Sequence, residues 1–221
     1  MTTAGRGAPL RGRFITIEGP DGSGKTLQAV RLRDAAVARG VACVLTREPG
    51  GTWAGERIRE ILLGAAATNE RISPRADALL FSAGRAQIVA EVVRPALERG
   101  ELVIDARHAD STLAYQGSGR GLDVDELRAV QRFATDGLVP DLTILLDLPA
   151  DVGLARKAAA EENRFEVGFD LDFHERVRAG YLALAAREPG RFVVVDADRD
   201  PEAVHGAVVE AAARVEPRLR A

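Results

Sequence analysis

The chain has 221 residues, 46% of them hydrophobic, and its 30 basic and 33 acidic residues give a net charge of −3. This length and apolar content suit one domain of three layers with a sizeable core, and the charge excludes the broad basic surface that a nucleic-acid duplex requires. Cys43, in an apolar run, is the single cysteine, and one cysteine cannot form a disulfide within the chain.

The first twelve residues, MTTAGRGAPLRG, are rich in Gly and Arg and lack the apolar core of a signal peptide. Nowhere does the sequence approach the ~18 consecutive apolar residues that a membrane-spanning helix needs. We therefore expect a flexible tail over 1–12 and a soluble, cytoplasmic protein that binds neither membranes nor nucleic acid.

Beyond residue 12, short apolar runs alternate with longer segments of helical spacing. The runs show little polar alternation, which is typical of strands buried on both faces of a parallel sheet. The runs cover 13–18, 41–46, 101–105, 141–147 and 191–196, and the helical segments cover 25–39, 53–64, 74–99, 123–136, 150–160, 171–186 and 200–214. This alternation predicts an α/β fold of three layers, with a five-stranded parallel sheet flanked by helices, in a single domain over 13–221. Ligands bind beyond the carboxyl ends of the strands in such sheets, so chemistry is expected there.

The first strand is followed by GPDGSGKT, which matches G-x-x-x-x-G-K-[ST] in full. Its glycines allow backbone N–H groups to surround an anion, and the next helix adds the positive end of its dipole. Lys25 is expected to reach the β- and γ-phosphates, and the Thr26 hydroxyl to bind Mg²⁺. The predicted ATP site consists of Gly19, Pro20, Asp21, Gly22, Ser23, Gly24, Lys25 and Thr26. The motif predicts nucleotide binding, but switches, motors and small-molecule kinases all share it.

Arginines follow the second and third predicted strands. Arg47 and Arg107 would meet at the same edge of the sheet, where two guanidinium groups can hold a doubly charged phosphate. The alternative for each is a surface ion pair.

Four stretches together closely resemble the thymidylate kinase family of nucleoside monophosphate kinases: EGPDGSGKT, REPGG, LLFSAGRAQ and RHADSTLAYQGSGRG. The resemblance runs from about residue 13 to the last helix, so it covers nearly the whole chain. It implies a P-loop kinase fold and ATP-dependent phosphorylation of dTMP to dTDP for dTTP synthesis. It also implies Mg²⁺ as the cofactor, a homodimer, and a cis bond between Glu48 and Pro49.

Phe81 and Arg85 lie four residues apart on one face of a predicted helix. By resemblance, Phe81 stacks on the thymine ring and Arg85 hydrogen-bonds to its edge. Without the resemblance, a helical Phe indicates core packing.

The segment after the third strand supplies the other residues implied at the dTMP site. Ser111 and Thr112 are placed for the base or the acceptor phosphate. Tyr115 resembles the aromatic wall that excludes a ribose 2′-hydroxyl, and Gln116 is a further candidate for that wall.

Asp21, within the phosphate loop, resembles the family's carboxylate beside the acceptor phosphate, where it would position that phosphate or help to hold the metal. The alternative is a simple turn residue.

Phosphoryl transfer places charge on the moving group, and an arginine usually neutralises it. Some family members carry this arginine in the phosphate loop, but here the four variable positions hold Pro, Asp, Gly and Ser. The chain therefore resembles the branch with the arginine in a mobile lid, at about 156–168. Arg164 aligns best with that arginine, Arg156 is the second candidate and Lys157 the third; a solvated segment is the alternative for each.

Ala106 stands where the family normally has an acid before Arg107. Asp105 is the nearest carboxylate, but in an extended strand its side chain points to the opposite face. Three explanations stay open. Asp105 replaces the acid through a local backbone shift; or Asp21 holds the metal with waters and Thr26; or the enzyme is slow or uses another acceptor.

A dTMP kinase is the leading hypothesis, with Lys25, Arg107, Arg164, Asp21 and Arg156 as the catalytic groups. The alternatives are a kinase of a related or modified nucleoside monophosphate, and a nucleotide-binding homologue with weakened catalysis.

Overall fold

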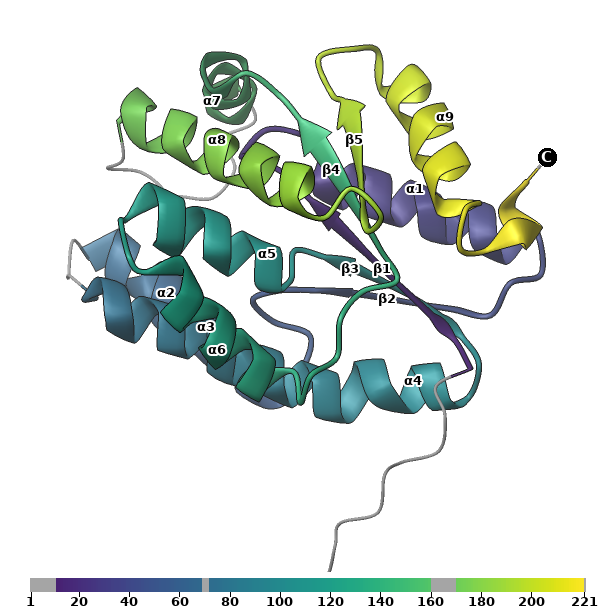
Figure 1. Ribbon diagram of the computed structural model, residues 1–221, viewed down its shortest axis with the longest axis horizontal. Coiled ribbons are helices and arrows are strands. Elements are labelled where there is room, and N and C mark those ends of the chain that lie inside the picture. Colours follow the sequence, from purple (N-terminus) through teal and green to yellow (C-terminus); the bar gives the residue numbers. More distant parts are fainter. Residues whose placement is uncertain (1–10, 69–71, 160–169, 221) are drawn as a thin grey trace, which may run out of the picture.

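The computed structural model (Figure 1) describes residues 11–68, 72–159 and 170–220. Its centre is the predicted five-stranded sheet, in which every neighbouring pair of strands is parallel and the order is β2-β3-β1-β4-β5. The strands are β1 (Arg13–Glu18), β2 (Cys43–Arg47), β3 (Leu102–Ala106), β4 (Leu142–Asp147) and β5 (Phe192–Asp196). The α/β prediction is confirmed, because strands without polar alternation lie where both faces of a sheet are covered.

Helices cover both faces of the sheet (Figure 1). The α-helices are α1 (Lys25–Ala38), α2 (Trp53–Thr68), α3 (Pro74–Ile88), α4 (Arg94–Glu98), α5 (Ala109–Thr112), α6 (Val124–Ala134), α7 (Ala150–Ala159), α8 (Leu171–Arg187) and α9 (Pro201–Ala212). Two π-helical segments, η1 (Val89–Val93) and η2 (Leu113–Gly119), and a short 3₁₀ helix, η4 (Pro217–Leu219), complete the described chain.

Alternate residues of each strand face different helices, because successive side chains point to opposite faces of a sheet. Ile17, Ile104 and Ala106 belong to the core cluster that includes residues of α1 and α9. Phe14 and Val103 face the other way and pack against α4. Asp105 therefore shares the face of Val103, while Ala106 shares the face of the phosphate loop.

Two helical regions differ from their predicted form. The predicted helix 74–99 is divided by the π-helical η1 before α4, which has Pro95 in its first turn. Proline lacks the N–H that a regular helix would require there. Residues 109–119, which lie outside the predicted helical segments, form α5 and η2.

Close packing explains the helical conformation of η2. A Cβ on Gly119 would collide with the ring of Phe173, and one on Gly180 would collide with the Ser118 hydroxyl. Glycines at these positions let η2 and α8 approach closely. This packing stabilises the helical conformation of residues 113–119, which their sequence does not predict.

The chain outside the sheet is described only in part. Residues 1–10 of the predicted tail lie outside the described residues, whereas Arg11 and Gly12 both donate backbone hydrogen bonds to the Leu97 carbonyl. Among the described residues, no helix is long and apolar enough to span a membrane.

Because β1, β2 and β3 are parallel, their carboxyl ends lie at the same edge of the sheet, and the residues that follow them meet there.

Candidate active site

The phosphate loop joins β1 to α1. Gly22 and Gly24 have positive φ angles of 74° and 83°, and a Cβ on Gly22 would collide with the Gly153 carbonyl, so this turn requires glycine. No side chain caps α1 at Gly24, which leaves its first N–H groups directed at the loop. Lys25 Nζ donates to the Pro20 carbonyl at 2.6 Å, so its ammonium group lies across the loop that would receive phosphates.

A pocket of about 600 Å³ opens beside this loop. It unites segments that are far apart in the sequence: the phosphate loop, the ends of β2 and β3, α3, η2 and α7. The predicted residues that line it are Asp21, Gly22, Gly24, Lys25, Thr26, Arg47, Phe81, Arg85, Arg107, Ser111, Thr112, Tyr115, Gln116 and Arg156. Gly19, Pro20 and Ser23 belong to the loop but do not line the pocket.

Three arginines converge on one part of the pocket. Arg47 is the last residue of β2 and Arg107 follows β3. Arg59, on α2, also lines the pocket and donates to the Pro49 carbonyl at 3.1 Å. Burial and the positive charges of Arg47 and Arg107 lower the pKa of Arg59, and Glu56 opposes this shift. Glu56 pairs with Arg47 at 3.2 Å and Asp21 pairs with Arg107 at 2.6 Å, so the three guanidinium groups face two acids. The remaining positive charge suits an anionic phosphate. Sequence reasoning missed Arg59, because a helical arginine twelve residues after Arg47 carries no motif.

Arg107 has a backbone conformation that is unusual for a residue with a side chain. Its φ of 74° lies in the left-handed region, and such strain concentrates at functional sites. Its Nη2 pairs with Asp21 Oδ1 at 2.6 Å, and its guanidinium lies 4.9 Å from the centre of the Tyr115 ring. The phosphate loop, the end of β3 and η2 therefore meet at this side chain.

A buried carboxylate fixes the chain after Arg107. Glu18 accepts hydrogen bonds from the His108 backbone N–H at 2.7 Å and from the hydroxyls of Ser111 and Tyr181 at 2.6 and 3.0 Å. Burial and the charge of Asp110 raise the pKa of Glu18, although its hydrogen bonds oppose this. Ser111 lines the pocket, but its hydroxyl is held by Glu18 and Tyr181, so it supports the wall of the pocket.

The predicted base subsite lies between α3 and η2. Phe81 is partly exposed and lines the pocket, while Arg85 lies almost fully buried behind it. Arg85 donates to Thr112 Oγ1 at 3.0 Å and also bonds to Gln131. Gln116 donates to Asp77 Oδ2 at 2.9 Å. The Phe81 ring and these polar groups thus line the same pocket.

Asp105 does not take the place of an acid at position 106. β3 continues without a bulge through Ala106, since Thr16 pairs with Asp105 and Ile17 with Ala106. Ala106 lines the pocket, whereas Asp105 is fully buried and does not line it. The opposite-face geometry expected of an extended strand holds, so Asp105 does not face the donor side of the pocket.

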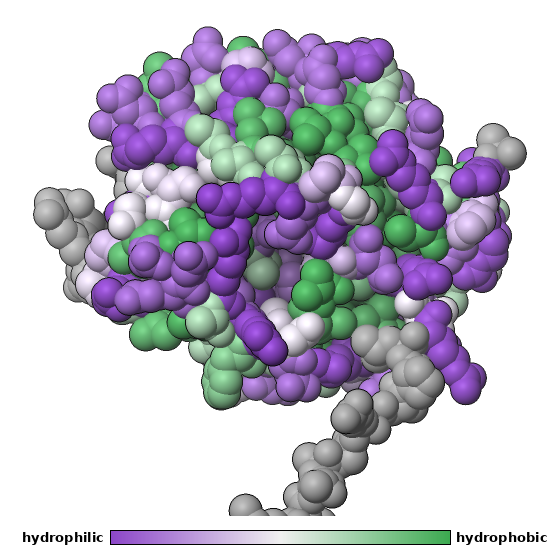
Figure 2. Space-filling model, viewed as in Figure 1, coloured by the Kyte–Doolittle hydropathy of each residue, from purple (hydrophilic) through white to green (hydrophobic). Residues whose placement is uncertain are grey.

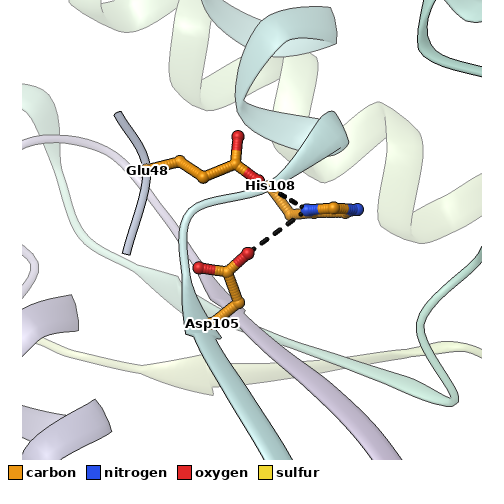
Figure 3. A group of neighbouring side chains, drawn as sticks. All are labelled: Glu48, Asp105 and His108. Atoms are coloured by element: carbon orange, nitrogen blue, oxygen red, sulfur yellow. Dashed lines mark hydrogen bonds and ion pairs between the residues drawn. The ribbon is translucent and has the colours of Figure 1, made fainter. Parts of the chain in front are cut away.

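Asp105 instead joins a buried cluster with Glu48 and His108 (Figure 3). His108 Nδ1 lies 2.8 Å from Glu48 Oε1 and 3.2 Å from Asp105 Oδ2. Burial lowers the pKa of His108, but the charge of Glu48 and the contacts with both acids outweigh it and raise this pKa to about 9. Burial raises the pKa of Asp105 to about 7.

These three residues could offer ligand atoms to a metal ion. However, the guanidinium of Arg85 lies 2.8 Å from Glu48 Oε2 and already neutralises this carboxylate. The three side chains therefore form, with Arg85, an internal network of charged groups.

Of the lid candidates, only two lie in the described chain. Arg156 donates to the Ala197 carbonyl at 2.9 Å and pairs with Asp198 at 3.0 Å, which ties α7 to the segment after β5. Lys157 also lines the pocket, with its Nζ 3.9 Å from Asp21 Oδ2. Arg164 and the rest of the predicted lid beyond residue 159 lie outside the described residues.

The chain is similar to known proteins over most of its length. Residues 17–208 match the family model described as thymidylate kinase. The chain is 53% identical over 190 residues to a thymidylate kinase of Deinococcus radiodurans, covering 86% of this chain and 90% of that protein. It is 54% identical over 201 residues to one of Thermomicrobium roseum, covering 88% and 91%. It is 50% identical over 216 residues to one of Desulfovibrio desulfuricans, covering 94% and 96%.

Proposed function

The chain belongs to the thymidylate kinase family, and we propose that it transfers the γ-phosphate of MgATP to dTMP in the pocket described above. The observation that carries this proposal is that one cavity is lined by two different groups of residues, each of which can hold a phosphate. The glycine-rich loop with Lys25 faces the guanidinium groups of Arg47, Arg59 and Arg107. A triphosphate and a monophosphate bound there would meet end to end.

Mg²⁺ fits the residues on the donor side. The Thr26 hydroxyl is exposed to the pocket and the Asp21 carboxylate lines it, and such oxygen groups suit a hard cation that keeps several of its waters. When bound, the ion would neutralise charge on the transferring phosphates. Thr26 and Asp21 are the residues we assign to hold it.

The reaction needs no general base, because the attacking oxygen belongs to a phosphate that is already anionic. Lys25 holds the donor phosphates, and Arg107, with Arg47 and Arg59, holds the acceptor in line with them. The protein then contributes alignment and charge neutralisation. We assign neutralisation of the transferred group to the lid, with Arg164 and Arg156 as candidates and Lys157 beside Asp21.

On the acceptor side, we assign the base to the space between α3 and η2, beside Phe81 and Arg85. Phe81 would stack on the ring, and Arg85 would donate to its edge together with Thr112. Tyr115 packs against Arg107 and lines the pocket, and we assign it to the wall that excludes a ribose 2′-hydroxyl. This wall would favour deoxyribose.

A homodimer is supported by hydrophobic side chains on α2, α3 and α6, which pack side by side. Trp53, Leu79 and Phe133 are exposed, Phe133 to 88%. In Figure 2, hydrophobic residues reach the surface at lower left, where Figure 1 draws these helices. Exposed hydrophobic side chains on neighbouring helices suit an interface with a second copy of the chain.

An acceptor screen tests the proposed function. ADP release from MgATP is measured with dTMP, dUMP, dCMP, dGMP and their ribose forms. We expect the largest kcat/KM for dTMP. A higher kcat/KM for another acceptor would reassign the base subsite, and an absence of transfer to every acceptor, with ATP binding intact, would contradict the kinase function.

A further inference from the structure

Arg85 is held by contacts on its buried side. Its side chain is 1% exposed, and Nη2 donates to the His108 carbonyl at 2.9 Å while Nη1 donates to Thr112. Its Nε has no hydrogen-bond partner among the described residues. A buried N–H group beside a pocket is costly unless a ligand accepts from it.

Glu48, the acid that pairs with Arg85, also contacts His108. Glu48 Oε2 lies 2.8 Å from Arg85 Nη2, and Glu48 Oε1 lies 2.8 Å from His108 Nδ1. Asp105 Oδ2 lies 3.2 Å from the same nitrogen. Figure 3 shows His108 reaching both acids, Asp105 from β3 and Glu48 from the segment after β2. The order Asp105, His108, Glu48, Arg85 alternates acidic and basic groups over four buried side chains.

We propose that Asp105 and His108 are positioning residues that hold Glu48, and through it Arg85, in the orientation that selects the pyrimidine base of the acceptor. This inference rests on the proposed function, in which Arg85 faces the base edge. Asp105 is fully buried and outside the pocket lining, so it acts only through its neighbours.

The chemistry of a guanidinium gives this network its specificity. Arg85 offers only hydrogen-bond donors. Thymine presents a carbonyl oxygen at ring position 4, whereas cytosine presents an amino group, itself a donor, at that position. A guanidinium held in one orientation therefore donates to the 4-oxo group of thymine. With cytosine, the guanidinium N–H and the 4-amino group are both donors and cannot form this hydrogen bond. A guanidinium free to turn away loses this discrimination.

Asp105→Asn tests the proposal, because asparagine keeps the size of the side chain but removes its charge. The readout is the ratio of kcat/KM for dTMP to kcat/KM for dCMP, with the KM for ATP measured in parallel. We expect the ratio to fall about 10-fold, within the range of coupling between contacting residues, and the KM for ATP to change less than about 2-fold.

Asp110→Asn is the matched control. Asp110 is also buried and lies in the same segment, but its ion pair is with Arg191, at 2.6 Å, and not with a member of the Arg85 network. We expect this variant to lose stability and to keep the base ratio of the wild type.

A double-mutant cycle separates positioning from a general effect on folding. In an Arg85→Lys background, Asp105→Asn should leave the dTMP:dCMP ratio nearly unchanged, because the group it orients is gone. Equal effects of Asp105→Asn in both backgrounds would overturn the proposal. If Asp105→Asn does not fold, Asp105→Thr serves instead, since Thr16 and Thr46 flank this position in the sheet register.

The outcomes distinguish this inference from the function on which it rests. Wild-type enzyme that does not phosphorylate dTMP would overturn both. Wild-type enzyme that prefers dTMP, together with Asp105→Asn that keeps the same preference, would overturn only the positioning role.

Discussion

Arg107 and Asp21 form an ion pair across the pocket, with 2.6 Å between Nη2 of the arginine and Oδ1 of the acid. The pair joins the end of β3 to the phosphate loop, so it links the acceptor side of the pocket to the donor side. Asp21 Oδ2 also lies 3.9 Å from Lys157 Nζ. A single carboxylate thus contacts cations from two elements, which makes Asp21 the central acid of a pocket that has alanine at position 106.

Ala106→Asp restores an acid to the pocket wall. Ala106 lines the pocket on the face of the phosphate loop, so the new carboxylate would face the donor phosphates and add an oxygen ligand for Mg²⁺. We expect kcat to rise severalfold, or the Mg²⁺ concentration for half-maximal rate to fall, with the KM for dTMP within about 3-fold of the wild type. Ala106→Asn controls for size. Loss of activity in Ala106→Asp alone would show that Asp21 already fills the role and that a second acid repels the phosphates.

Tyr115→Ala should weaken the preference for deoxyribose. Removing the ring opens the space that a 2′-hydroxyl would need, and pocket walls of this kind discriminate by roughly 10- to 200-fold. The ratio of kcat/KM for dTMP to that for its ribose form should fall about 10-fold. Tyr115→Phe keeps the ring beside Arg107 and should keep the ratio. An unchanged ratio in Tyr115→Ala would place the sugar elsewhere.

His108 should make the free energy of unfolding fall as the pH becomes alkaline. Its folded pKa is about 9, above the ordinary value of 6.5, so the folded state binds the proton more tightly. The resulting stabilisation is fully present below pH 6.5 and is lost as the pH rises through about 9, on the order of 3 kcal/mol in all. Urea unfolding at pH 6, 8 and 10 measures this loss.

His108→Gln should flatten the loss of stability between pH 8 and pH 10. The control is His174→Gln, because burial lowers the pKa of His174 and this residue is neutral throughout that range. A His108→Gln variant with the slope of the wild type would show that other groups cause the pH dependence.

Phe133→Asp should separate the proposed homodimer. Phe133 is so exposed in a single chain that its replacement should cost little folding stability, while a charge at the centre of an apolar interface is strongly unfavourable. Light scattering after size-exclusion chromatography should give twice the mass of the chain for the wild type and the mass of one chain for the variant. Val194→Asp, on the edge strand β5, is the matched control and should remain dimeric.

Much of the fold follows from local patterns. Apolar runs with little polar alternation predicted the buried parallel strands, and the glycines and Lys25 of the phosphate loop predicted both its turn and its helix start. The carboxyl-end rule then predicted that Arg47 and Arg107 would meet. The alternation of strand side chains likewise predicted that Asp105 points away from Ala106.

The remaining features depend on tertiary contacts. Residues 109–119 form helical turns because Gly119 and Gly180 allow η2 to approach α8, and neither glycine favours a helix by itself. Arg57 and Arg59 are two residues apart on α2, yet Arg57 pairs with Glu60 on the surface while Arg59 lines the pocket. Only the packing of the helix distinguishes them.

The central claim is that Arg107 holds the acceptor phosphate while the glycine-rich loop holds ATP. Calorimetric titration of Arg107→Ala with dTMP, and separately with MgATP, tests this claim most directly. We predict that the Kd for dTMP rises about 30-fold or more, as expected when a charged partner is removed from a buried ion pair, and that the Kd for MgATP changes less than about 3-fold. Equal losses for both ligands, or unchanged dTMP binding, would contradict the account.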